Sequence, residues 1–170
     1  MKEAGVDAVP FQHEKIEEWR DAIRRGITFL YPGTNLLITG GVDDLWVDKK
    51  GNLIVVDYKA TSKNDKVSLD ADWQISYKRQ MSLYTWLFEK NGFKVSDTGY
   101  FVYCNGNSKL PAFNGRIEFE ITVIPYKTDF SWIDAAIQSA YACLQSPKAP
   151  EPTEACAFCE YEKQLRGLKD

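Results

Sequence analysis

Acidic residues interrupt two strongly apolar segments near the middle of the chain. Residues 36–48 and 52–59 are rich in Ile, Val, Leu and Trp, yet they contain Asp43, Asp44 and Asp57. The apolar residues favour β-strands, and the glycine between the two segments indicates a hairpin turn. A carboxylate in such a strand is costly unless a partner offsets its desolvation. The segment therefore predicts a hairpin whose carboxylates have partners.

The chemistry of the turn predicts which acidic residues face each other. A three-residue loop at 49–51, with the glycine in the left-handed position after a type I turn, sets Asp48 opposite Asn52. Counting back along both strands, Asp43 then faces Asp57. Residues directly opposite on antiparallel strands point to the same face, so these two carboxylates would lie close together.

Two facing carboxylates repel each other, and a cation between them is the natural remedy. Side chains alternate along a strand, so Lys59 shares the face of Asp57 and places a positive charge beside such a cation. A register slipped by one residue would put Asp44 in the place of Asp43; otherwise Asp44 is expected to be solvated.

This arrangement resembles the PD-(D/E)XK nuclease superfamily, in which an acidic residue on one strand faces an Asp/Glu-x-Lys motif on the next. Here the two parts are Asp43 and residues 57–59. Further motifs resemble the RecB-like exonuclease branch, including the CRISPR-associated RecB-like exonucleases. These motifs are a Gly-x-x-Asp at 40–43, a Gln-x-x-x-Tyr at 80–84, the upstream His13, and the C-terminal Cys156 and Cys159.

The resemblance implies an α/β fold with a restriction-endonuclease-like core, in which helices flank a mixed central β-sheet. Residues 1–170 would form one nuclease-like domain, with a short cysteine-containing tail from about residue 147. The elements expected from the sequence pattern are helices at 13–25, 72–91 and 131–145 and, after the hairpin, strands at 98–105 and 116–126.

The resemblance also implies a metal-dependent nuclease that hydrolyses phosphodiester bonds of DNA, as an exonuclease in repair, recombination or defence. Asp43, Asp57 and the backbone carbonyl of Tyr58 would hold Mg²⁺ or Mn²⁺, hard cations that prefer oxygen ligands. Lys59 would orient the attacking water or neutralise charge on the phosphoryl oxygens. RNA is not excluded as a substrate, and a helicase or another nucleic-acid-processing protein is the expected partner.

Other residues complete the expected site. Gln80 and Tyr84 lie four apart on one helix face. The resemblance implies that they contact the substrate backbone; a partly buried polar stripe is the alternative. The family has a metal-contacting histidine upstream, which His13 would match, although an exposed or helix-capping histidine explains it equally well. The expected phosphate contacts, which a solvated charged face would also explain, are Lys63, Lys66, Lys78 and Arg79.

The C-terminal Cys156 and Cys159 have a spacing that suits one metal or cluster iron. Relatives with an iron–sulfur cluster supply one cysteine from the N-terminal side and three from the C-terminal side. This chain departs from that pattern, because its other cysteines are Cys104 and Cys143. We therefore expect a structural zinc or two free thiols rather than an intact iron–sulfur cluster, unless a ligand lies upstream in a longer protein.

Composition sets the remaining expectations. A formal net charge of −3 over 170 residues gives no overall basic footprint for nucleic acid, although a local basic patch can coexist with an acidic total. Four cysteines without a dense framework favour a reducing compartment, and no segment has a signal core or membrane-spanning length. A cytoplasmic protein without a membrane partner follows.

Two other classes of function compete with a nuclease. A noncatalytic nucleic-acid-binding or assembly module that keeps the nuclease fold is the alternative, but it has no reason to retain Asp43, Asp57 and Lys59 together. A nucleotide-binding enzyme has no support, because no glycine-rich phosphate loop precedes a helix.

Overall fold

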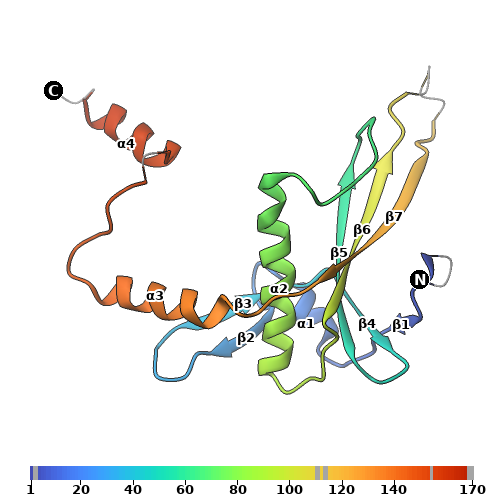
Figure 1. Cartoon of the computed structure of the whole chain (residues 1–170), viewed down its shortest axis with the longest axis horizontal. Coiled ribbons are helices and arrows are strands. Elements are labelled where there is room, and N and C mark those ends of the chain that lie inside the picture. Colours follow the sequence, from blue (N-terminus) through green and yellow to red (C-terminus); the bar gives the residue numbers. More distant parts are fainter. Residues whose placement is uncertain (2–3, 110–111, 113–114, 154, 168–170) are drawn as a thin grey trace. The chain divides into compact units, whose positions relative to one another are not determined.

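A five-stranded mixed sheet carries the acidic segment (Figure 1). The strand order is β1-β4-β5-β6-β7, and β5 and β6 are parallel whereas the other neighbours are antiparallel. Helix α2 (Ile75–Lys90) lies in the connection that two parallel strands require. The strands are β1 (Ala8–Pro10), β4 (Asp44–Asp48), β5 (Leu53–Thr61), β6 (Thr98–Gly106) and β7 (Phe119–Lys127). The expected α/β class with a mixed central sheet and flanking helices is confirmed.

The computed structural model describes residues 1, 4–109, 112, 115–153 and 155–167. The chain divides into two units, residues 1–133 and 134–170, and the second unit holds nearly all of α3 (Ile133–Gln145) and the whole of α4 (Ala157–Gly167). Among the described residues, no helix is both long and apolar enough to cross a bilayer. The assignment of one domain with a tail from about residue 147 stays a prediction.

The predicted hairpin register is confirmed. Asp44 pairs with Val56 and Val47 with Leu53, which continues to Asp48 opposite Asn52. The backbone N–H of Asp48 donates to the carbonyl of Asn52 at 3.1 Å, and the glycine of the turn has a φ of 77°. The same register, extended one residue beyond β4, places Asp43 opposite Asp57.

The expectation of one continuous strand over residues 36–48 is wrong. Strand β3 (Leu37–Gly40) pairs instead with β2 (Ile27–Leu30) in a separate two-stranded sheet, and β4 begins only at Asp44. A Cβ on Gly41 would lie 2.3 Å from the Ala22 side chain, so the glycine lets the chain pass close to the N-terminal segment. The backbone N–H of Val42 then donates to the carbonyl of Trp19, which holds the break in place.

The first helix is also shorter than expected. Helix α1 spans only Ile16–Arg20, because Asp21 leaves the helical conformation and its carboxylate accepts bonds from the backbone of Arg24 and the guanidinium of Arg25. Ile23 lies beyond the end of this helix and is 95% exposed. The other expected elements are present, and their boundaries agree to within three residues.

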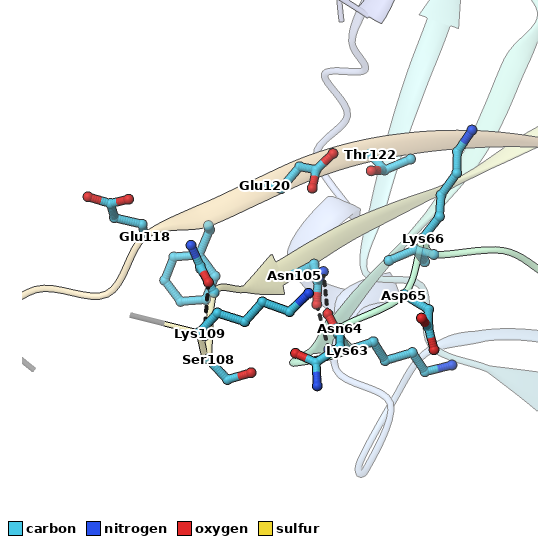
Figure 2. A pocket seen from close by; sticks show the side chains of 13 residues that line it. Lys63, Asn64, Asp65, Lys66, Asn105, Ser108, Lys109, Glu118, Glu120 and Thr122 are labelled. Atoms are coloured by element: carbon cyan, nitrogen blue, oxygen red, sulfur yellow. Dashed lines mark hydrogen bonds between the residues drawn. The ribbon is translucent and has the colours of Figure 1, made fainter. Parts of the chain in front are cut away.

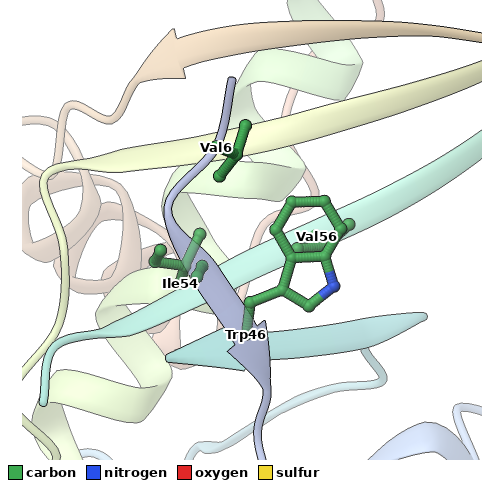
Figure 3. Packing of buried hydrophobic residues seen from close by; sticks show 5 residues of the cluster. Val6, Trp46, Ile54 and Val56 are labelled. Atoms are coloured by element: carbon green, nitrogen blue, oxygen red, sulfur yellow. The ribbon is translucent and has the colours of Figure 1, made fainter. Parts of the chain in front are cut away.

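The two faces of the sheet are covered differently. Helix α2 packs on one face, where Met81 is buried and a Cβ on Gly99 would lie 2.5 Å from its sulfur. The opposite face is covered by the N-terminal segment, whose Val6 packs with Trp46, Ile54 and Val56 (Figure 3). Because side chains alternate along β5, residues of odd number from 55 face α2 and those of even number face the N-terminal segment.

Candidate active site

Asp57 is a buried carboxylate at the centre of the sheet. It lies on β5 next to Phe101 of β6, and only 4% of its surface is exposed. Its Oδ2 lies 2.5 Å from Nζ of Lys59, yet within the described residues no group donates a well-directed hydrogen bond to this atom. Burial raises the pKa of Asp57 above its ordinary value, Lys59 opposes that change, and the charge of Asp43 adds to it.

Lys59 connects this carboxylate to helix α2. Its Nζ lies 4.4 Å from the ring centroid of Tyr77, in addition to the ion pair with Asp57. An ammonium over an aromatic face is attracted by the ring, so Tyr77 holds the lysine beside the carboxylate. The sequence signals this contact only through the spacing of Tyr77, which precedes Gln80 by three residues and so shares its helix face.

Asp43 lies in the bend before β4 and is exposed. Its Oδ2 accepts a hydrogen bond of 2.8 Å from the backbone N–H of Tyr58, which ties the two strands together beside Asp57. Among the described residues, no hydrogen bond to the other oxygen, Oδ1, is defined, so Oδ1 is available for another partner. The two predicted carboxylates are therefore brought together, with one buried and one open to solvent.

Asp44 belongs to the opposite face of the sheet. Its carboxylate accepts hydrogen bonds from Nη2 of Arg20 at 2.6 Å and from the phenol of Tyr58 at 2.8 Å. Burial alone would raise the pKa of Asp44, but these bonds outweigh it and hold the pKa below its ordinary value. Burial and the bond to Asp44 raise the pKa of Tyr58 to about 12. The interpretation of Asp44 as a solvated residue is wrong, and so is the slipped register that would place it opposite Asp57.

Gln80 and Tyr84 lie together on α2. The Gln80 side-chain amide donates a 3.0 Å hydrogen bond to the Tyr84 hydroxyl, and both residues are partly buried. A Cβ on Gly40 would lie 2.6 Å from the Tyr84 ring, so this ring packs against the start of the Gly-x-x-Asp motif. The glycine thus lets the helix motif approach the segment that carries Asp43.

His13 lies in an aromatic cluster. Its ring stacks on Trp19 at 4.5 Å, and its Nδ1 accepts a 3.1 Å hydrogen bond from the backbone N–H of Lys15, just before α1. This bond lies in the turn that precedes α1, and the helix itself begins after Lys15 without a side-chain capping bond. In the described part of the chain no three His, Cys, Asp or Glu side chains converge as a metal cluster, so His13 is not joined to Asp43 and Asp57 in that way. Its role as a ligand stays a prediction.

The oxygen groups at Asp43 and Asp57 suit a hard divalent cation. Mg²⁺ is usually bound through one or two carboxylates and keeps several waters, so a cluster of three acidic side chains is not required. Within the part of the chain that the structure describes, the buried Oδ2 of Asp57 has no well-directed hydrogen-bond donor, although Nζ of Lys59 lies 2.5 Å away, and burial raises the pKa of Asp57. A cation between the two carboxylates would give this oxygen a partner and would stabilise its buried negative charge.

The four basic residues expected to contact phosphate lie in two hollows of the N-terminal unit. Lys63 and Lys66 line a hollow of about 530 Å³ that lies between the loop after β5 and the β6–β7 strands (Figure 2). Lys78 and Arg79 line a second hollow of about 280 Å³, where the Arg79 guanidinium lies 5.9 Å from the ring of Trp132. The structure therefore separates the four residues into two pairs.

Cys156 directly precedes α4, and Cys159 lies in its first turn. The backbone N–H of Cys159 contacts Sγ of Cys156 at 3.5 Å, and this bond lowers the pKa of the Cys156 thiol. The bond with Cys156 raises the pKa of Cys159. Cys104 lies on β6 and Cys143 on α3, and all four thiols are free. The pair alone supplies two ligands, which neither a structural zinc nor a cubane cluster can use without others.

Comparison with known proteins identifies the family of the chain. A family model described as the PD-(D/E)XK nuclease superfamily matches residues 2–164. No curated protein and no solved structure matches the chain.

Proposed function

The chain belongs to the PD-(D/E)XK nuclease superfamily, and from that premise we propose that it is a metal-dependent nuclease that hydrolyses phosphodiester bonds of DNA. The mixed sheet with flanking helices is consistent with the restriction-endonuclease-like fold of that superfamily. One observation carries the proposal: the Asp57 carboxylate is buried, faces Asp43 and pairs with Lys59 at 2.5 Å. Burying charged groups costs free energy of folding, and groups with perturbed pKa values cluster at functional sites.

In this proposal Asp43, Asp57 and the backbone carbonyl of Tyr58 hold Mg²⁺ or Mn²⁺. A divalent cation supplies an acidified water and stabilises negative charge on a phosphoryl group. Tyr58 fixes the geometry of the set, because its backbone N–H donates to Asp43 and its phenol donates to Asp44.

Lys59 provides the positive charge of the site. Its ammonium lies over the ring of Tyr77 and pairs with Asp57. In the proposed complex it turns toward a phosphoryl oxygen and keeps its contact with the ring. That placement stabilises charge that develops on the phosphate during attack. Gln80 and Tyr84 contribute uncharged donors that position the substrate backbone without competing for the cation.

The finer assignments extend this proposal. The Gly-x-x-Asp and Gln-x-x-x-Tyr motifs support an exonuclease of the RecB-like type, which acts in the cytoplasm in repair, recombination or defence, with a helicase or similar protein as its partner. Lys63, Lys66, Lys78 and Arg79 contribute phosphate contacts from the two hollows.

The test is cleavage of labelled linear and circular DNA with Mg²⁺, Mn²⁺ or EDTA. We expect metal-dependent cleavage that Lys59→Ala removes while calorimetry finds nearly unchanged metal affinity. Lys50→Ala, which removes an exposed lysine from the hairpin turn, is the matched control and should cleave as the wild type does. No cleavage of any DNA or RNA by the wild type, together with no metal binding that depends on Asp43 and Asp57, would leave the noncatalytic binding module.

A further inference from the structure

Trp73 is exposed on the surface, although exposing a large apolar ring to water is unfavourable. All five tryptophans lie in the described part of the chain, and Trp73 is the exposed one, with 55% of its surface accessible. By comparison, Trp86 on the same helical segment is 1% exposed. A single exposed apolar residue needs no explanation by itself, so its surroundings decide what it signifies.

The backbone beneath Trp73 is firmly held. Trp73 lies in the short helix η2 (Asp72–Gln74), and the neighbouring Gln74 is 1% exposed. The Gln74 amide donates to the carbonyl of Ser68 at 2.8 Å and to the hydroxyl of Tyr103 at 3.3 Å, while its oxygen accepts the N–H of Ala71. The loop after β5 is thus tied to the sheet, and the indole is presented from a fixed position.

Lys63 is fixed beside the indole in a similar way. The Asn105 side chain accepts a 2.8 Å hydrogen bond from the Lys63 N–H and donates a 3.1 Å bond to its carbonyl (Figure 2). The Lys63 ammonium lies 5.5 Å from the Trp73 ring centroid. A cation at that distance and exposure is held weakly, so it can turn from the ring to a phosphate at small cost.

A chain of contacts leads from this indole to the buried carboxylate. The rings of Trp73 and Tyr77 meet edge to face with centroids 5.3 Å apart. Tyr77 in turn carries Lys59, which pairs with Asp57. From β5 to the loop, the order of contacts is therefore a lysine, two aromatic rings and a second lysine, so stacking surfaces and positive charges lie side by side.

We infer that Trp73 and Lys63 form a subsite for single-stranded DNA next to the active site, in which a base stacks on the indole and the adjoining phosphate binds the lysine. The inference rests on the proposed function and adds the strand preference of the site. Proteins that bind single strands combine aromatic platforms with basic side chains, because every base has a π-face. Paired bases in a duplex are already stacked on one another, so the indole favours an unpaired nucleotide.

The experiment measures binding of fluorescein-labelled single-stranded and duplex oligonucleotides in EDTA, where cleavage does not interfere. We expect Trp73→Ala to weaken single-strand binding by about 5- to 150-fold, the range found for loss of one base-stacking contact. Duplex binding should change less than twofold. Trp73→Phe should restore most of the affinity, and Tyr161→Ala, which removes an exposed aromatic ring from α4, should leave it unchanged.

Lys63→Ala supplies an independent measurement. The slope of log affinity against log salt for the single strand should become shallower by about 0.7, the value for one phosphate contact. If Trp73→Ala is poorly folded in a thermal melt, Trp73→Leu keeps the apolar bulk and should show the same loss. Equal effects on single strands and duplex, or no effect of Trp73→Ala and Trp73→Leu on single strands, would overturn the subsite. Cleavage that survives with unchanged binding refutes the subsite alone, whereas Trp73-dependent binding without metal-dependent cleavage refutes the nuclease alone.

Discussion

Replacing Asp57 with Asn tests the metal site without relying on activity. The substitution preserves the size of a buried side chain and removes its charge, while Asp43 and Lys59 remain. In the metal-free protein, two consequences of the substitution stabilise the fold and one destabilises it. Cross-strand repulsion with Asp43 disappears, which is worth about 0.2–1 kcal/mol, and the buried carboxylate no longer requires desolvation.

The opposing effect is the loss of the ion pair with Lys59. The Lys59 side chain is 19% exposed and retains the face of Tyr77, so its ammonium keeps part of its hydration and one attractive contact. We therefore expect the free energy of unfolding of metal-free protein to change by no more than about 1 kcal/mol, which is about 2–4 °C in the melting temperature of a chain of this size.

The effect of metal should be larger. A cation at 100 times its dissociation constant stabilises the wild type by about 2.7 kcal/mol, which corresponds to about 5–11 °C. Asp57→Asn should lose most of this shift, whereas Asp70→Asn, at an exposed position in the loop after β5, should keep it. Thermal melts with and without Mn²⁺ measure both quantities. An undiminished metal shift in Asp57→Asn would refute the assignment of Asp57 as a ligand.

The pH dependence gives a second check on the same residue. A carboxyl whose folded pKa is raised contributes stability that is fully present below its unfolded pKa, near 3.9, and is lost as the pH rises through the folded value. The stability of metal-free Asp57→Asn relative to the wild type should therefore be highest near neutral pH and should fall on acidification between the raised pKa and about 3.9. A difference that is constant with pH would contradict the raised pKa.

Three further predictions concern other parts of the chain. Gln80→Ala and Tyr84→Phe should slow cleavage more than they lower the melting temperature; a large loss of stability with intact specific activity of the folded fraction would indicate packing instead. Asp44→Asn should lower the free energy of unfolding by about 1–3 kcal/mol in denaturant titrations, because charge-assisted bonds from two neighbours are lost, and an unchanged midpoint would refute that role. Protein prepared without oxygen should lack broad absorbance near about 400 nm, and stoichiometric iron and sulfide bound through Cys156 and Cys159 would overturn that expectation.

The sequence predicted the hairpin well because its register depends on local chemistry. A glycine that must adopt a positive φ fixes the turn, and period-two alternation then determines every pair along the strands. The facing of Asp43 and Asp57 followed from counting alone. Alternation also placed Lys59 on the face of Asp57, as the structure shows.

The failures arose where tertiary contacts decide. Residues 36–48 have the composition of one strand, and only the close approach of Ala22 to Gly41 shows why the strand must break there. Asp44 looked solvated because its partners, Arg20 and the Tyr58 phenol, come from distant segments or the opposite strand. Long-range partners of this kind leave no periodic signal in the sequence.

The alternation of side chains along β5 predicts that the proposed function and the stability of the fold can be changed separately. Asp57 and Lys59 face α2, where they pair with each other and with Tyr77, whereas Tyr58 faces the opposite side and bonds Asp44. One strand thus carries a costly charge pair on one face and the polar contacts that anchor it on the other. Substitutions on the first face should change metal binding and cleavage with little change in folding, and substitutions on the second should do the reverse. The test is a set of variants on each face, with thermal melts and cleavage measured on the same preparations. If Asp57 and Lys59 were merely a structural ion pair, variants on both faces would change stability alike.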